Sequence, residues 1–149
     1  MSEIFVDEGL DVIMAIFPKN GAGLGTTYIG LFTSQTATTT PARTATGGAS
    51  PAGWTQATGN GYARQAIAAA SWGAQATNGN GRKTTGPQIT FPTVGVGGWG
   101  TVNGFFLATA DSSQSGDKII FFSNFDDATA VTLNENDIIK VTPSMQFDG

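Results

Sequence analysis

The sequence contains no histidine and no cysteine, and charged residues make up only 12% of it. The lack of cysteine excludes disulfides, thiolate nucleophiles and zinc–thiolate sites, and the lack of histidine removes the most common general base. The formal net charge is −4, and the nearest approach to a basic patch is the pair Arg82-Lys83. Nucleic acid is therefore an unexpected partner, because phosphate binding needs clustered cations. No apolar run approaches the ~20 residues of a membrane-spanning helix, so we expect no membrane partner either.

What the sequence has in place of charge is neutral polarity. It contains 21 glycines, many Thr, Ser, Asn and Gln residues, and an ordinary apolar fraction of 40%. Glycine and β-branched threonine disfavour long helices and suit short strands joined by tight turns. A surface with few charges also suits burial by neighbouring subunits, so we expect assembly into an oligomer.

Short segments of strand character recur along the chain between turn signals such as Asn78-Gly79-Asn80-Gly81 and Asn134-Glu135-Asn136. Several short strands at regular spacing are typical of a sandwich or barrel. We predict a mainly β, single domain over residues 1–149, of β-sandwich or jelly-roll type. The expected strands are Thr26–Thr33, Tyr62–Trp72, Gln88–Phe91, Gly100–Ala108, Lys118–Phe122, Ala130–Leu133, Asp137–Thr142 and Ser144–Phe147.

Two further segments stand apart from the strands. Near the N-terminus an apolar stripe repeats at helical spacing, and Pro18 and Asn20-Gly21 end it, which predicts a helical arm within residues 1–20. Its acidic start is unlike a signal peptide, so we expect the protein to be made and assembled in the cytoplasm. Residues 34–53 predict an extended Thr/Ala/Gly loop, which either lies across a neighbour or is a simple excursion. The stripe and the loop supply most of the candidate interface residues: Leu10, Ile13, Met14, Phe17, Pro41, Arg43 and Pro51.

Motifs with catalytic or binding chemistry are weak in this sequence. Gly95, Gly97 and Gly100 match a dinucleotide-binding pattern, but a strand is expected after them where the motif needs a helix. Residues 111–117 resemble the start of a calcium loop, but Phe122 stands at the twelfth place instead of Glu. Asp126-Asp127 resembles a carboxylate pair, but adjacent strand residues point to opposite faces. We therefore expect no enzyme activity, no cofactor and no metal site.

Most aromatic residues are expected in the core, although an exposed set would suit sugar stacking. Trp54 is included among the candidate interface residues. Arg64 is the last candidate, because a charged residue set among Ala, Gln and Ile needs a fixed carboxylate or carbonyl partner. That partner belongs either to this chain, as an ordinary salt bridge, or to a neighbour.

The order of several segments carries a resemblance to a family. Gly61-Tyr62-Ala63-Arg64-Gln65 is followed by Trp72, by Ile89-Thr90-Phe91-Pro92 and by Trp99-Gly100-Thr101-Val102, then by a strand ending near Ala108 and a final strand from Asp137. Over roughly residues 28–146 this layout resembles small virion proteins of tailed bacteriophages, of the tail-fibre or minor tail type, and is similar in size to capsid decoration (cement) proteins.

The resemblance implies a non-enzymatic structural protein located in the virion, which binds other virion proteins. The first hypothesis is a decoration protein that binds the major capsid protein and stabilises the particle. The alternative is a tail or tail-fibre component that contacts tail proteins, with possible binding of a host glycan. A glycan-binding or glycan-cleaving module is a third hypothesis.

Overall fold

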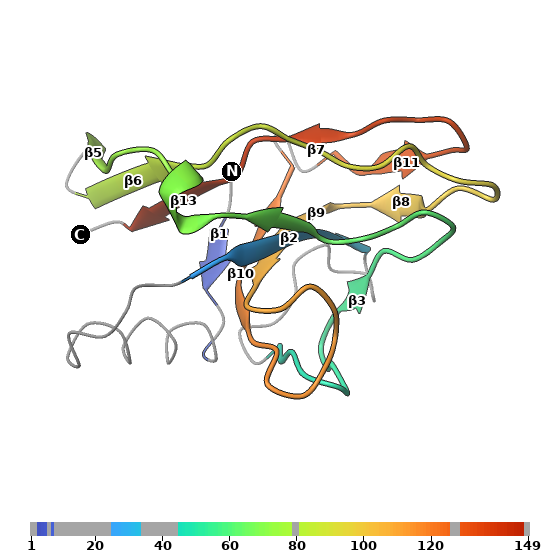
Figure 1. Cartoon of the computed structure of the whole chain (residues 1–149), viewed down its shortest axis with the longest axis horizontal. Helices are drawn as coiled ribbons and strands as arrows, with labels where there is room; N and C mark the ends of the chain where they lie inside the picture. The colour runs from blue at the N-terminus through green and yellow to red at the C-terminus, as the bar shows by residue number, and fades with distance from the viewer. Residues whose placement is uncertain are drawn as a thin grey trace.

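The computed structural model describes residues 3–5, 7, 25–33, 45–78, 81–125 and 129–147. These residues form antiparallel strands joined by turns, together with one short 3₁₀ helix, η1 (Ala69–Ser71) (Figure 1). The prediction of a mainly β chain is confirmed. No closed barrel is present among the strands of the described ranges.

The larger sheet, called the main sheet below, is antiparallel throughout. Its strand order is β1-β10-β9-β2-β3, and β4 lies beside the first half of β2. The central strands β9 and β10 are buried along their whole length, which explains why their sequences are nearly continuous apolar runs and do not alternate. The strands are β1 (Glu3–Phe5), β2 (Thr27–Thr33), β3 (Thr55–Gln56), β4 (Gln65–Ile67), β9 (Gly104–Ala108) and β10 (Ile119–Asn124).

The three smaller sheets join into one long structure, called the ribbon below. Their pairs β6–β13, β7–β12 and β8–β11 follow in order, so residues 82–102 run antiparallel to residues 131–147. Backbone bonds continue the ladder between them, from Gly86 N to Pro143 O at 2.8 Å and from Phe91 N to Ile139 O at 3.0 Å. The strands are β5 (Ala76–Asn78), β6 (Gly81–Thr85), β7 (Ile89–Thr90), β8 (Gly100–Val102), β11 (Val131–Leu133), β12 (Lys140–Val141) and β13 (Ser144–Phe147), with β5 as a third strand at one end.

A glycine-rich turn interrupts the ribbon ladder between Val94 and Trp99. Gly97 and Gly98 adopt φ values of 90° and 72°, in the left-handed region that favours glycine. The turn is held from outside the ribbon, because Gly95 N donates to Asn60 O at 3.1 Å. Strand β8 follows it, so the glycine pattern serves a turn and opens no helix, as the sequence predicted.

The main sheet and the ribbon share a continuous segment of chain. Residues 100–108 were predicted as one strand, but the structure divides them into β8 in the ribbon and β9 in the main sheet. The division falls at Asn103, whose N–H donates to Phe32 O at 2.9 Å and whose carbonyl accepts from Phe125 N at 3.0 Å. Both backbone groups of the crossing residue are therefore satisfied by neighbours of the main sheet.

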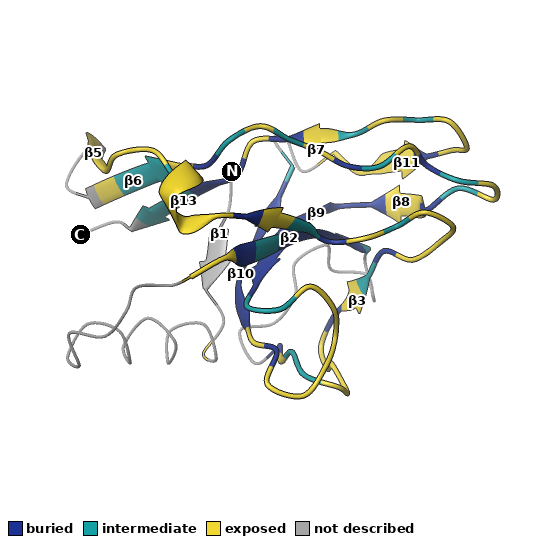
Figure 2. Cartoon of the chain, in the orientation of Figure 1, coloured by how far each residue is buried: buried dark blue, intermediate teal, exposed yellow. Residues whose placement is uncertain are grey.

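The buried residues form two apolar clusters on opposite faces of the main sheet, and Figure 2 shows β9 and β10 buried between them. Neighbouring residues of one strand point to opposite faces, so Phe105 belongs to the cluster beneath the ribbon and Phe106 to the other. The larger cluster fills the space between the main sheet and the ribbon. The smaller one consists of Phe32, Ala45, Trp54, Phe106, Ala108, Ile119 and Phe122.

Other predictions fared unevenly. The strand expected at Thr26–Thr33 is confirmed as β2, whereas the one expected over Tyr62–Trp72 shrinks to β4 and gives way to η1. Residues 68–70 are exposed alanines, which gain little by packing on a sheet. The structure does not confirm the jelly-roll arrangement, since the ribbon strands β6, β7 and β8 pair with β13, β12 and β11 as one long antiparallel hairpin.

The two segments predicted outside the strands are described only in part. Residues 3–5 form strand β1, so the arm predicted over residues 1–20 is not helical at its start. Asp7 is helical and exposed, and the rest of the predicted helix lies outside the described residues. Of the loop predicted over residues 34–53, the part from Ala45 onward is described, and it folds back on itself through a bridge between Thr46 and Ala52.

Candidate functional site

Arg64 is the centre of a buried polar network, called the arginine anchor below. It lies just before β4, and its side chain is fully removed from solvent, as is that of Asp117. Its Nη1 donates to Asp117 Oδ2 at 3.0 Å and to Ala110 O at 2.8 Å, while Nη2 donates to Ser113 Oγ at 3.2 Å. Its Nε donates to Gln56 Oε1 at 3.0 Å. The guanidinium group thus joins β3 to the loop between β9 and β10.

Asp117 holds the other side of that loop. Its Oδ1 accepts from Ala110 N at 3.2 Å, and its backbone N–H donates to Gln114 O at 3.0 Å. The turn that resembled a calcium loop is thereby closed by its own residues, and its seventh position is committed to Arg64. Within the described ranges, no group of three or more Asp or Glu side chains is placed to bind a metal ion.

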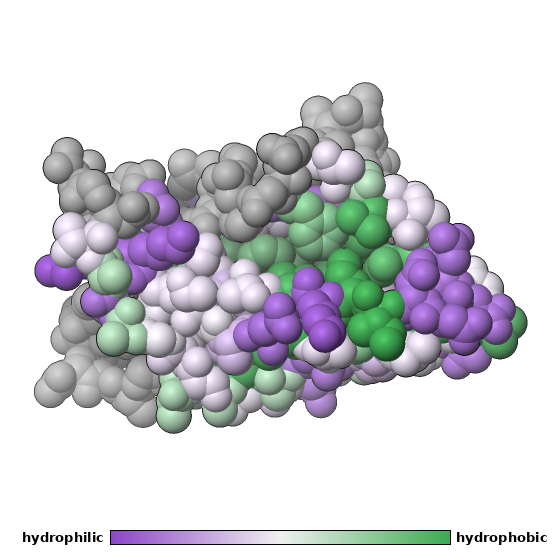
Figure 3. Space-filling model, turned by 90° about the horizontal axis from the view of Figure 1, so that it is seen from above, coloured by the Kyte–Doolittle hydropathy of each residue, from purple (hydrophilic) through white to green (hydrophobic). Residues whose placement is uncertain are grey.

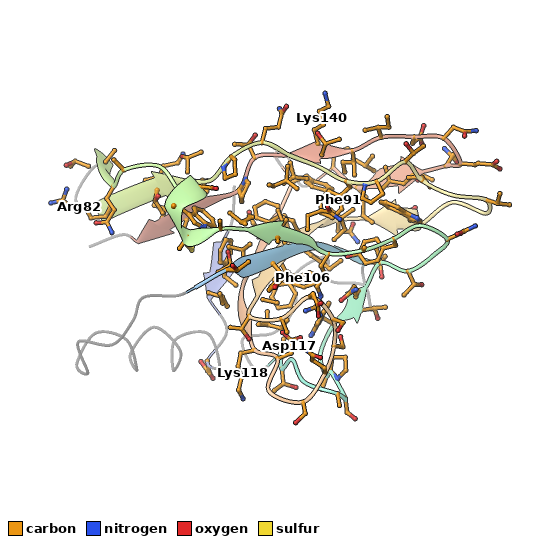
Figure 4. The ribbon with its side chains drawn as sticks, in the orientation of Figure 1. Arg82, Phe91, Phe106, Asp117, Lys118 and Lys140 are labelled. Atoms are coloured by element: carbon orange, nitrogen blue, oxygen red, sulfur yellow. The ribbon has the colours of Figure 1, made fainter. Side chains whose placement is uncertain are left out.

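Phe106 places an aromatic ring against the anchor. The carbon Cζ of Arg64 lies 4.9 Å from the centre of the ring, within the range of a cation–π interaction. Trp54 packs on the same ring with centroids 4.6 Å apart. Gly30, opposite Phe106 in the ladder, makes room for it, because a Cβ there would lie 2.6 Å or less from two ring carbons. Figure 4 shows Phe106 and Asp117 on the side of the main sheet away from the ribbon.

Tyr62 supplies a hydrogen-bond partner to the backbone of β2 between the parts of that strand that pair with β3 and β4. Its hydroxyl accepts from Leu31 N at 2.8 Å, while Ala57 N donates to Leu31 O at 2.9 Å. The ring packs edge-to-face on Trp99 with centroids 5.2 Å apart. Burial raises the pKa of the Tyr62 hydroxyl well above its ordinary value, against smaller opposing effects of the Leu31 hydrogen bond and the Arg64 charge. The hydroxyl therefore stays neutral and serves as a backbone partner.

We expect Tyr62→Phe to lower the free energy of unfolding by about 1–3 kcal/mol, because the buried Leu31 N–H loses its partner. Since the folded pKa lies above the unfolded value of ~10, the contribution of this group is complete below about pH 10 and declines as the pH rises further. Urea unfolding at about pH 8 and about pH 11 measures both effects. The variant should lose less stability than the wild type between the two pH values, and an equal loss would contradict the assignment.

Of the predicted interface residues, Pro51, Trp54 and Arg64 lie within the described part of the chain. Trp54 is 5% exposed and belongs to the smaller core cluster, where its Nε1 donates to Thr46 O at 2.9 Å. Arg64 has the carboxylate and carbonyl partners that its sequence context predicted, and they come from its own chain. Pro51 is exposed in the turn after Thr46. The other candidates, Leu10, Ile13, Met14, Phe17, Pro41 and Arg43, lie outside the described residues, as do Asp126 and Asp127.

The roles of Asp117 and Tyr62 were not predicted from the sequence. Asp117 was interpreted only as part of a turn. An available signal was its place directly before the apolar strand β10, where an acid needs a buried partner. The roles of Tyr62 and Gly30 depend on pairings between distant strands, which the sequence alone does not show.

The exposed large aliphatic side chains of the described residues are all on the ribbon or its turns. They are Val96 at 71%, Ile138 at 57% and Val131 at 39% exposure. Apolar residues gather near the middle of the upper face, with polar ones on both sides (Figure 3). Lys140 points outward from the same layer (Figure 4). The outer face of the ribbon, which is the face turned away from the main sheet, is the candidate contact surface. No helix in the described part of the chain is long and apolar enough to cross a membrane.

Together these features define an antiparallel β module in which the Arg64–Asp117 pair and most of the large aromatic side chains are used for internal packing. The chain belongs to the family described as podophage GP4 fiber I protein gp80, whose family model matches residues 19–145. It is thus a structural protein of a tailed-phage virion, of the tail-fibre type, as the resemblance implied. No curated protein matches the chain.

Proposed function

We propose that the protein is a non-enzymatic component of the tail fibre, which binds other tail proteins and forms homo-oligomers. The observation that carries the proposal is the family match, which extends from residue 19 to residue 145 and so includes every strand of the main sheet except β1 and the ribbon up to the start of β13. We further propose that it is incorporated into the particle within the host cytoplasm.

The contacts of Arg64 and Asp117 support a structural role. A buried ion pair is costly to form unless further hydrogen bonds accompany it, and Arg64 donates to Gln56, Ala110 and Ser113 as well as to Asp117. Because these groups are occupied within the chain, they are not free to act on a substrate. Among the residues that the structure describes, no group of three or more Asp or Glu side chains is placed to bind a metal ion.

The outer face of the ribbon supports the binding role. On this face Ile138, which is 57% exposed, supplies apolar contact area. Low charge reduces the desolvation cost of burying this face against a partner. We propose that this face contacts a neighbouring tail protein.

The hypothesis of a capsid decoration protein receives less support than its alternative, because the matching family is named for a fibre. Glycan binding is also less well supported, because two of the three tryptophans are buried. Sugar stacking needs exposed aromatic rings, but Trp54 and Trp99 are 5% and 3% exposed, and their indole nitrogens donate hydrogen bonds to Thr46 O and Asn60 O.

Separation of heads from tails in dissociated phage particles tests the location. We expect the protein in the tail fraction and its absence from heads, with the major capsid protein as the marker for heads. Recovery on heads alone would overturn the fibre assignment in favour of a decoration protein. As a test of the non-enzymatic role, we expect no turnover of host glycans; turnover that disappears in Asp126→Asn or Asp127→Asn would contradict it.

A further inference from the structure

Within the described part of the chain, strand β1 is the outermost strand of the main sheet and pairs with β10 alone. The ladder is antiparallel, with Glu3 opposite Ser123, Ile4 opposite Phe122 and Phe5 opposite Phe121. Figure 1 shows β1 beside β10, although the two strands are far apart in the sequence. An N-terminal strand therefore completes a sheet edge formed by the second half of the chain.

Strand β10 needs a partner on that edge. All of its residues, Ile119–Asn124, are buried, and β9 pairs with it on the other side only. Buried backbone N–H and C=O groups that lack partners are costly. Whatever chain supplies the strand, the edge of β10 has to be covered.

The length of the segment that connects β1 to β2 allows β1 to pair with β10 of another copy. Residues 6–26 separate β1 from β2. A segment of this length spans ~30 Å if helical throughout and up to ~70 Å if extended. A domain of this size has a radius of gyration of ~15 Å, so either length reaches the corresponding edge of an adjacent copy.

We propose that β1 is an exchangeable strand, which pairs with β10 of a second copy of this chain when copies are held close together. The exchanged state uses the same ladder as the closed chain, so it requires no new complementary surface, and mutual exchange links subunits at low energetic cost. This inference rests on the proposed oligomerisation and names the strand and the edge that carry it.

Disulfide trapping between separately labelled chains tests the exchange. The native sequence has no cysteine, and paired Cα atoms of adjacent antiparallel strands lie ~4.5–5.5 Å apart, within reach of a disulfide. One chain carries Glu3→Cys and the other Ser123→Cys. The two are unfolded, mixed, refolded together at high concentration and oxidised with oxidised glutathione, and the cross-linked peptides are identified by mass spectrometry.

We expect a disulfide-linked dimer that joins position 3 of one chain to position 123 of the other. A doubly substituted chain, Glu3→Cys with Ser123→Cys, measures the register, and we expect it to form the same link. In the matched control, Thr90→Cys replaces Ser123→Cys, because Thr90 is exposed in the ribbon. It should give no link above background.

A link that forms only within the doubly substituted chain would overturn the exchange. Failure of that chain to form any link would overturn it as well, since β1 would then not occupy the edge of β10. These outcomes are independent of where the protein lies in the particle. A protein found on heads with exchange intact would refute the fibre assignment alone.

Discussion

Replacement of Arg64 by alanine lowers the free energy of unfolding by about 3–5 kcal/mol, because it leaves the buried carboxylate of Asp117 without its cation. Both side chains are fully buried, so solvent does not compensate for the loss. The change also removes the bonds to Gln56 Oε1, Ala110 O and Ser113 Oγ, and so frees the loop between β9 and β10 from β3. Chemical denaturation of the purified protein measures the effect.

Two variants separate the loss of the ion pair from general damage. Arg82→Ala removes an exposed arginine of β6 and should change stability by less than about 0.5 kcal/mol. The double variant Arg64→Met with Asp117→Leu replaces both charges by apolar groups and should be more stable than Arg64→Ala, since no buried charge remains unpaired. A cost below about 1 kcal/mol for Arg64→Ala would contradict the central role of the anchor.

Replacement of Phe106 by alanine is expected to cost about 3–5 kcal/mol, the usual range for a fully buried phenylalanine. Its ring is in contact with Trp54, Phe122 and the guanidinium group of Arg64. The empty space cannot be filled from across the ladder, because residue 30 is glycine. Thermal or urea unfolding checks the value, with Phe106→Leu as the milder control at about 1.5 kcal/mol or less.

The two effects should be coupled. Because the guanidinium group lies over the Phe106 ring, Arg64→Ala and Phe106→Leu should not be additive when combined, with an interaction energy of about 0.5–3 kcal/mol. Strict additivity would show that the ring and the cation stabilise the fold independently.

The sequence predicted the strands best where one strong local signal decided them. The segment Thr26–Thr33 has high β-propensity and became β2, and Lys118–Phe122 became most of β10. The division of residues 100–108 at Asn103 was not predictable, because it arises from bonds to Phe32 and Phe125, which are distant along the chain. Similarly, β1 was missed because the apolar stripe after it predicted a helical arm over residues 1–20, and its pairing with β10 joins distant parts of the chain.

The sequence predicted that Arg64 has a fixed partner, but not which residue that partner is. The need of Arg64 for a fixed partner followed from its apolar surroundings and is confirmed, but nothing local indicates that the partner is Asp117, 53 positions away. The packing of the loop predicted over residues 34–53 also depends on distant residues. In its described part, Ala45 is buried and Thr46 O accepts a hydrogen bond from Trp54, whose ring packs on Phe106 and Phe122.

A cryo-EM map of the intact virion tests the assignment to the tail fibre most directly. The account predicts density for the main sheet and the ribbon within the fibre, with the outer face of the ribbon against another tail protein. Density for this module on the capsid surface, and its absence from the fibre, would contradict the account.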